Sequence, residues 1–270
     1  MRDVLLWMGV LVAAVPASAQ ILATSARQLS KGSLKILGYY QGVKGQVHTF
    51  SINGAGSCTT ASGSVSFPCD QAGDVEAKGS GGGAVVKILG QPFEGGQYYG
   101  LLGVGGYSLR VPSTTITNTL SGDSPGLTAG FGAKATIIPD TIVTPAVAFD
   151  FSVTYSQYKF NRRFPGGSGL DHRINQRLRF WQYQVALESS HLFVDAFSGW
   201  DIEPYGGVKY FFTESYLKDY QDGSRAGGKR HMASPFLGFK VPMWDQEGLF
   251  AEASFVDGYQ FGAGLEIRFN

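Results

Sequence analysis

The chain has 270 residues, with 22 basic and 21 acidic side chains, so its formal net charge is +1. This balance supplies no basic field for a nucleic acid, and no nucleic-acid partner is expected. Its 38 glycines, 19 phenylalanines and 13 tyrosines favour strands in which aromatic and small side chains alternate. Beyond the first 19 residues, no stretch reaches the roughly 18 to 20 consecutive apolar residues of a membrane-spanning helix.

Residues 1–19 have the pattern of a secretory signal peptide. A positive Met-Arg start is followed by an apolar run over residues 4–15 and by a small-residue Ala-Ser-Ala cleavage pattern that ends at Ala19. The run is too short to span a membrane, and no cysteine follows Ala19 to carry a lipid anchor. We therefore expect an exported mature chain that starts at Gln20.

The next segments predict a lead-in, a long strand and a loop. Residues 20–32 are mostly polar and are expected to form a loosely held periplasmic lead-in. Residues 33–52 are β-prone, with a shift of phase near residues 42–45 that predicts a bulge or a tight bend. The loop predicted over residues 53–74 contains both cysteines, Cys58 and Cys69. Two cysteines in one loop of an exported protein most simply pair.

Further strands are predicted where side chains alternate with period two. They cover residues 75–89, 98–111, 126–138, 144–156, 176–188, 201–212, 232–243, 249–256 and 259–269, while residues 189–200 show no clear phase. With residues 33–52 this gives about ten strands. The long connections are predicted at residues 53–74, 112–125, 157–175 and 213–231, and most of the connections between them are short. That alternation of long and short loops favours a barrel over a soluble sandwich.

The last strand shows the alternation most clearly. Its odd-numbered positions, from Tyr259 to Phe269, are apolar, whereas its even-numbered positions include Glu266 and Arg268. This segment resembles the terminal strand of bacterial outer-membrane β-barrels, which ends in an aromatic residue and is recognised by the barrel insertion machinery. Here Asn270 follows Phe269, a small departure from that pattern.

The resemblance implies an all-β fold. We expect a single transmembrane antiparallel up-and-down β-barrel of about ten strands, covering residues 33–270 and located in the outer membrane, with apolar side chains toward lipid and polar ones toward the lumen. An aspartate or lysine inside a dry soluble core would cost several kcal/mol unless it were paired. A wet or ion-paired lumen accommodates both Asp150 and Lys134.

The predicted lumen face carries a balanced set of charges. Its members are Lys134, Asp150, Glu203, Lys209, Lys240, Glu252, Glu266 and Arg268, joined by Lys87, Arg110 and Glu188. Such a set either forms an ion-paired network that fills the lumen of a structural or binding barrel, or lines a narrow porin-like channel. The sequence leaves both interpretations open.

An enzymatic alternative comes from outer-membrane proteases of the omptin type, which share this size and topology. Their chemistry needs an Asp-His pair that faces acidic residues across the outer rim. The candidates are Asp171 and His172 with Asp219 or Asp222, but neighbours in a strand point to opposite faces, so no catalytic residues are assigned. His48 and His191 lack ligand-like spacing, so neither a metal nor another cofactor is expected.

Basic side chains gather near the predicted outer rim. The outer loops and the strand start beside them carry Arg162, Arg163, Arg173, Arg177, Arg179, Arg225, Lys229, Arg230 and His231. Such residues can bind the phosphates of lipopolysaccharide, and the candidate contacts are Arg162, Arg163, Arg225, Lys229 and Arg230. The same residues serve two other interpretations, a surface adhesin and ordinary solvated loop charge.

The cysteine pair gives a first prediction. Cys58 and Cys69 are expected to be disulfide-bonded in the exported protein, because both lie in one loop. Thiol labelling of the denatured protein should modify neither cysteine until a reductant is added. Complete labelling of both thiols without reductant contradicts the pairing.

Overall fold

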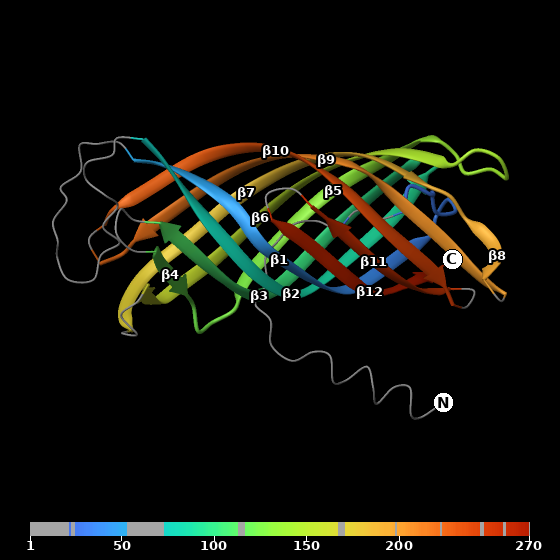
Figure 1. The fold of residues 1–270 in the computed structure, drawn as a ribbon. Coiled ribbons are helices and arrows are strands. Elements are labelled where there is room, and N and C mark those ends of the chain that lie inside the picture. The colour runs from blue at the N-terminus through green and yellow to red at the C-terminus, as the bar shows by residue number, and fades with distance from the viewer. Residues whose placement is uncertain are drawn as a thin grey trace, which may run out of the picture.

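The computed structural model describes residues 22, 25–52, 73–112, 117–166, 171–197, 199–221, 223–243, 246–255 and 258–269. The predicted signal peptide and the predicted disulfide between Cys58 and Cys69 lie outside these residues. Within the described ranges, no helix is long and apolar enough to cross a membrane. The described secondary structure consists of β-strands (Figure 1).

Twelve strands follow one another along the described chain: β1 (Leu34–Ile52), β2 (Gly73–Phe93), β3 (Gly96–Pro112), β4 (Thr117–Ser121), β5 (Gly126–Ile138), β6 (Ala146–Pro165), β7 (His172–Ser190), β8 (Phe193–Phe197), β9 (Trp200–Asp219), β10 (Arg225–Pro242), β11 (Glu247–Ser254) and β12 (Tyr259–Phe269). Ten of them close an antiparallel ring, because β10, β11, β12, β1, β2, β3, β5, β6, β7 and β9 pair in that order and β9 pairs again with β10. The predicted all-β barrel of about ten strands is confirmed.

The two ends of the barrel differ. The first described strand begins where the last one ends, since Leu34 pairs with Phe269, and only residues 94 and 95 separate β2 from β3 at this end. At the other end, 20 residues separate β1 from β2. Outer-membrane barrels place short turns in the periplasm and longer connections outside. We therefore call the two ends the periplasmic end and the outer end.

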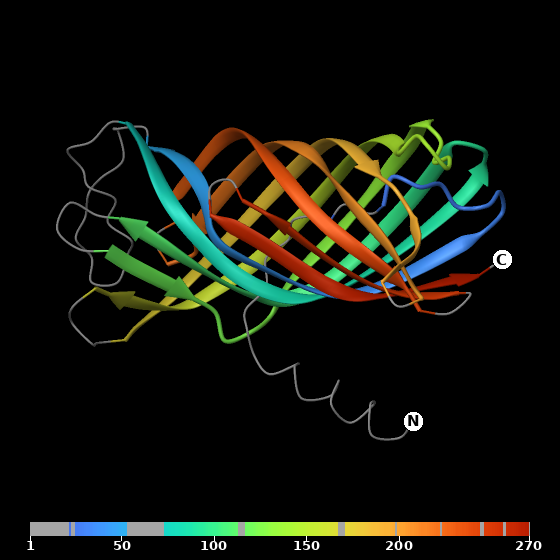
Figure 2. The same cartoon turned by 45° about the vertical axis from the view of Figure 1, so that its right-hand side comes forward.

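Two of the predicted outer loops are mostly strand. β6, β7, β9 and β10 are 20, 19, 20 and 18 residues long, whereas about 9 to 11 residues cross a bilayer. These strands run along the barrel (Figure 2), and their lengths mean that they continue past the part that a membrane can cover. The long loops predicted at residues 157–175 and 213–231 are therefore wrong, and the loop predicted at residues 112–125 contains β4.

The loops were mispredicted because the polarity of the wall inverts along the long strands. In the lower part of β6, Phe149 and Phe151 are exposed on the outer face while Asp150 between them is buried. In the upper part of the same strand, Tyr158 and Phe160 are buried while Lys159 is exposed. Lipid outside demands the first pattern and water outside demands the second. The alternation continues, but at the membrane surface the outward side chains change from apolar to polar and the inward ones from polar to apolar.

The barrel narrows toward the outer end. The hairpin of β11 and β12 is short, and beyond its tip β1 pairs directly with β10 at Ser51 and Gly227. A Cβ at the neighbouring Gly228 would collide with the Thr49 carbonyl oxygen, so glycine permits this close approach. The outer end is thus an eight-stranded ring of β1, β2, β3, β4, β6, β7, β9 and β10.

The bulge predicted near residues 42–45 is confirmed. The register of β1 against β2 shifts between Lys44 and Gln46, and Gly45 has a φ of 84°, which glycine adopts without strain. The bulge lies beside the tip of the short hairpin, because Gly258 approaches Gly45. It therefore marks the level at which β1 leaves β12 and turns toward β10.

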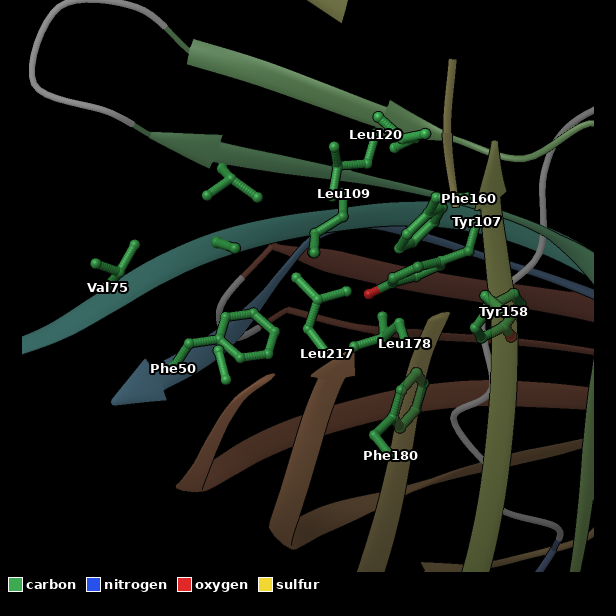
Figure 3. Packing of buried hydrophobic residues seen from close by; sticks show 14 of the residues in the cluster. Phe50, Val75, Tyr107, Leu109, Leu120, Tyr158, Phe160, Leu178, Phe180 and Leu217 are labelled. Carbon is green, nitrogen blue, oxygen red and sulfur yellow. The ribbon is translucent and has the colours of Figure 1, made fainter. Parts of the chain in front are cut away.

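Apolar side chains fill the outer part of the lumen. This apolar layer consists of Val43, Phe50, Val75, Ala77, Tyr107, Leu109, Val111, Leu120, Tyr158, Phe160, Ile174, Leu178, Phe180, Leu217 and Ala226 (Figure 3). The rings of Tyr107 and Tyr158 stack with centroids 4.8 Å apart. The interior of an eight-stranded ring is just wide enough for side chains to fill, and here they fill it.

One strand faces opposite to expectation. The apolar alternation of Tyr99, Leu101, Tyr107 and Leu109 predicts that they share a lipid-facing side, but that side is the lumen, since all four are buried. Arg110, predicted to point inward, is exposed. Many glycines and aromatics occupy both faces of β3, so its hydrophobic pattern does not distinguish inside from outside.

The outer face of β6 gives a second prediction. Phe151→Arg places a charge against hydrocarbon and should destabilise the folded barrel by about 2 to 4 kcal/mol. Gln157→Arg lies on the same face above the lipid-facing part and should change stability little. Urea titration of both variants folded into lipid vesicles measures the difference. Equal stability of the two variants would mean that this face does not meet lipid.

Candidate functional site

Buried charges line the periplasmic half of the lumen. This charged layer consists of Lys35, Lys87, Lys134, Asp150, Glu188, Glu203, Lys209, Lys240, Glu252 and Glu266, all of them buried. They come from nine strands, β1, β2, β5, β6, β7, β9, β10, β11 and β12, at positions whose neighbours face lipid. The layer therefore surrounds the whole lumen.

Strand register places opposite charges side by side on one flank of the layer. Lys134 of β5 lies directly opposite Asp150 of β6, with its Nζ 3.8 Å from Asp150 Oδ2. Lys134 also forms an ion pair with Glu188 of β7, and the Tyr99 hydroxyl donates to Asp150 at 2.5 Å. Directly opposed cross-strand pairs are the basic unit of sheet stabilisation. These two carboxylates thus depend on one lysine.

The opposite flank repeats this arrangement. Lys240 of β10 lies opposite Glu203 of β9, and its Nζ is 2.5 Å from Glu266 Oε1 and 3.6 Å from Glu203 Oε2. Lys35 Nζ approaches Glu266 Oε2 at 3.1 Å, and Lys209 pairs with Glu252. Paired burial offsets the several kcal/mol that each isolated charge would cost.

The lumen residues proposed from sequence are therefore brought together, with two exceptions, Arg268 and the outward-facing Arg110. Lys134, Asp150, Glu203, Lys209, Lys240, Glu252 and Glu266 each form an ion pair. Arg268 lies on the same strand face as Glu266 and is half-buried, but it forms no ion pair with a described residue. Lys35 was missed because the phase of the first strand is ambiguous before its bulge.

The described residues of the predicted lead-in, 22 and 25–32, form what we call the N-terminal segment, and this segment lies inside the barrel. This corrects the prediction that they form a loosely held lead-in. Among them, Leu22, Ser25, Ala26 and Leu29 are buried. The segment runs to β1 at the end that also holds the C-terminus (Figure 2). Because the segment is mostly polar, we expected it to lie in solvent. Instead, several of its polar groups form hydrogen bonds with side chains in the lumen.

Charged-layer side chains bind this segment through its backbone. Lys87 Nζ donates to the Leu22 carbonyl oxygen at 3.3 Å, and Lys134 Nζ donates to the Ser25 carbonyl oxygen at 3.3 Å. The Ser25 hydroxyl donates to Glu203. Three hydrogen bonds therefore join the segment to the charged layer and give partners to buried polar atoms on both sides.

An ionic cluster closes the periplasmic mouth. Arg27 lies 3.2 Å from Asp140 and 3.5 Å from Glu203. His191 Nδ1 lies 2.9 Å from Asp140 Oδ1. Asp140 comes from the β5–β6 turn and His191 follows β7, so this cluster ties two periplasmic turns to the N-terminal segment.

The side chains are almost fully buried at both levels of the lumen. Lys134 and Glu188 are each 1% exposed, and Glu203 and Lys209 are 0% exposed. Above them, Phe50, Phe160 and Phe180 of the apolar layer are also 0% exposed. These side chains of both layers therefore have almost no contact with water.

His48 is a polar group held within the apolar layer. Its Nδ1 lies 2.8 Å from Ser215 Oγ and its Nε2 lies 2.5 Å from the Tyr107 hydroxyl. Tyr107 in turn donates to Gln46 at 3.0 Å. Both ring nitrogens are used, which identifies a structural histidine that connects β1, β3 and β9. No cluster of metal-ligating side chains occurs in the described part of the chain.

The residues of the protease alternative do not converge. His172 is exposed and lies opposite Arg163, and Asp171 lies 3.8 Å from Arg162. Asp219 is buried and accepts hydrogen bonds from the Gln176 side chain and the Gln221 amide, both at 2.8 Å. Asp222, the other acidic candidate, lies outside the described residues.

Three of the basic candidates at the outer rim are already paired with acids. Arg162 lies 3.1 Å from Asp123, Lys229 2.9 Å from Glu214, and Arg230 2.6 Å from Glu76. Arg163 also has interactions within the protein. Arg225 forms no ion pair with any described acid, so the five candidates differ in how far the protein neutralises them.

The closed ring, its apolar outer face and its charged interior decide the class of protein. The chain is an outer-membrane β-barrel. No protein-family model matches the sequence, and no curated protein matches it either. Similar solved structures include the translocator domain of autotransporter NalP from Neisseria meningitidis, at 12% identity with a TM-score of 0.48 and 90% of each chain covered.

Two further similar structures are OprG and an outer-membrane channel. OprG from Pseudomonas aeruginosa is 8% identical, with a TM-score of 0.44 and coverage of 92% of this chain and 100% of its own. The channel from Pseudomonas putida F1 is 10% identical, with a TM-score of 0.37 and coverage of 93% and 100%. The membrane assignment rests on the lipid-facing wall and the lumen described above.

The shared lysine gives a third prediction. Lys134→Met leaves the Glu188 and Asp150 carboxylates buried without their cation, which should cost about 3 to 5 kcal/mol of folding free energy. Lys229→Met removes an exposed ion pair and should have little measurable effect. Urea unfolding in lipid vesicles compares the two. A Lys134→Met barrel as stable as Lys229→Met would show that the charged layer does not hold the wall together.

Proposed function

We propose that the protein is a closed structural or binding barrel of the outer membrane, with no open pore at rest. The observation that supports this most directly is the burial of the lumen: Glu203 and Lys209 in the charged layer and Phe180 in the apolar layer are all 0% exposed. In a barrel of this size, side chains can nearly fill the interior, which leaves little free cross-section.

Two independent structures close the lumen in series. In the periplasmic half, the N-terminal segment occupies the space that the charged layer surrounds, and Lys87 and Lys134 donate to its carbonyl oxygens. In the outer half, the apolar layer fills an eight-stranded ring. Ions crossing this barrel would have to break buried ion pairs and then enter a hydrocarbon-like region, and each step carries a large desolvation cost.

A narrow channel is the second candidate, favoured by the balanced charge of the charged layer. Such a channel would conduct only if the N-terminal segment left the lumen and the apolar layer opened. We infer a non-enzymatic role in either case, since His172 lies opposite Arg163 rather than beside a carboxylate. General acid–base catalysis requires a convergent geometry that these side chains do not have.

Planar-bilayer recording tests the closed state and gives a fourth prediction. The wild-type protein should show no long-lived conductance. A variant that lacks residues 20–32 and carries Phe160→Ala with Phe180→Ala removes material from both layers and should show openings. The same deletion without the alanine substitutions is the matched control and should stay closed, because the apolar layer remains. Stable wild-type conductance contradicts the closed barrel and favours the porin-like alternative.

A further inference from the structure

Four basic side chains form one row across the outer part of the wall. Lys159 of β6 pairs in register with Arg177 of β7, Arg177 with Lys218 of β9, and Lys218 with Arg225 of β10. Neighbouring strands lie about 4.8 Å apart, so the row is about 14 Å long. We call Lys159, Arg177, Lys218 and Arg225 the cationic row.

The row faces outward above the lipid-facing part of the wall. Lys159 alternates with the buried Tyr158 and Phe160, and Arg177 alternates with the buried Gln176 and Leu178. Lys159 and Arg225 are exposed, while Arg177 and Lys218 are half-buried. The row is therefore presented on the outer surface and does not line the lumen.

Aromatic side chains place the row at the height of lipid headgroups. Trp181 lies four residues below Arg177 on the same face of β7, and its ring is 4.9 Å from that of Tyr155 on β6. Aromatic girdles mark the membrane–water interface of such barrels. Four residues of a tilted strand rise by about 10 Å, which carries the row from the girdle into the headgroup region.

No described acidic residue neutralises the row. No ion pair joins any of its four members to an acidic residue within the described ranges, in contrast to Arg162, Lys229 and Arg230 nearby. Like charges directly opposite each other on neighbouring strands destabilise a sheet. Three such pairs in succession therefore oppose folding unless an external anion binds them.

An aromatic ring fixes two of the cations. The Tyr220 ring lies 5.1 Å from Arg177 Cζ and 4.4 Å from Lys218 Nζ, so cation–π attraction orients both side chains. Arg179, two residues below Arg177 on the same exposed face, adds a further cation. Oriented guanidinium and ammonium groups favour multivalent phosphate, which arginine binds through two parallel hydrogen bonds.

We propose that the cationic row binds the phosphate groups of a glycolipid in the outer leaflet, in the manner of lipopolysaccharide. The ligand is phosphate carried by a lipid because the row sits directly above an aromatic girdle. The sequence already placed Arg177 and Arg225 among the basic residues near the outer rim, and the structure adds Lys159 and Lys218 to the site. It depends on the orientation of the barrel in the membrane and is independent of whether the lumen conducts.

Binding to purified lipopolysaccharide tests the proposal. Wild-type protein in detergent micelles is titrated with lipopolysaccharide, and a variant carrying Lys159→Gln, Arg177→Gln, Lys218→Gln and Arg225→Gln is titrated in parallel. Affinity should fall at least about tenfold, since charge-assisted hydrogen bonds are lost. The control variant carries Arg162→Gln, Lys229→Gln and Arg230→Gln and should bind nearly as well as wild type. Heat-modifiable gel migration verifies that each variant is folded.

Two further arms identify the ligand. Dephosphorylated lipopolysaccharide should bind wild type as weakly as intact lipopolysaccharide binds the fourfold variant. Inorganic phosphate should compete poorly, because a single anion cannot span the row; full competition at millimolar concentration would make free phosphate the ligand and overturn the proposal. Equal affinity of the fourfold variant and wild type, or an equal loss in the control variant, would also overturn it.

A stability measurement provides a second test of the proposal if the fourfold variant folds poorly. Lys218→Gln alone removes two like-charge contacts, so without glycolipid it should raise the urea midpoint or leave it unchanged. With lipopolysaccharide present, it should gain less protection than wild type. A variant that loses stability in the absence of glycolipid and gains as much protection as wild type in its presence would show that Lys218 has only a structural role.

Discussion

The structure depends on one constraint: the long strands pass through two surroundings, while their inner faces remain buried. Side chains alternate between the two faces of a strand, so the outer face must be apolar against lipid and polar against water. On β6, Phe151 meets the first demand and Lys159 meets the second. The inner face has the opposite order: the charged Asp150 lies in the periplasmic half and the apolar Phe160 lies in the outer half. Both layers of the lumen follow from this inversion.

The charged layer and the N-terminal segment require each other. Charges inside a barrel need partners, and the strand register supplies many of them, as it does for Lys134 with Asp150. The remaining donors of Lys87 and Lys134 bind carbonyl oxygens of the segment. An extended segment with free backbone groups is well suited to a space lined by charges, because its carbonyls and amides would be costly to bury against apolar walls. The lumen is thereby filled without a helix.

The taper from ten to eight strands separates the two functions that we propose. Below the short hairpin of β11 and β12, the wall is wide enough to contain the N-terminal segment. Above it, β1 meets β10 and the apolar layer fills the narrower ring. The same upward extension of β6, β7, β9 and β10 aligns Lys159, Arg177, Lys218 and Arg225 on the outside. Closure of the lumen and exposure of the cationic row are two consequences of long strands.

The sequence by itself determined the class of fold and the faces of β5, β6 and β12, because period-two alternation is a local property of a strand. It also placed Lys134, Asp150 and Glu266 inside the barrel. Only the tertiary structure decided where strands continue beyond the membrane, because the surroundings that invert the pattern are set by the whole barrel. It also decided that β3 turns Tyr99 inward and that the N-terminal segment enters the lumen. The partners of each charge depend on register between strands far apart in sequence, as Lys35 and Glu266 are, and no local pattern contains that information.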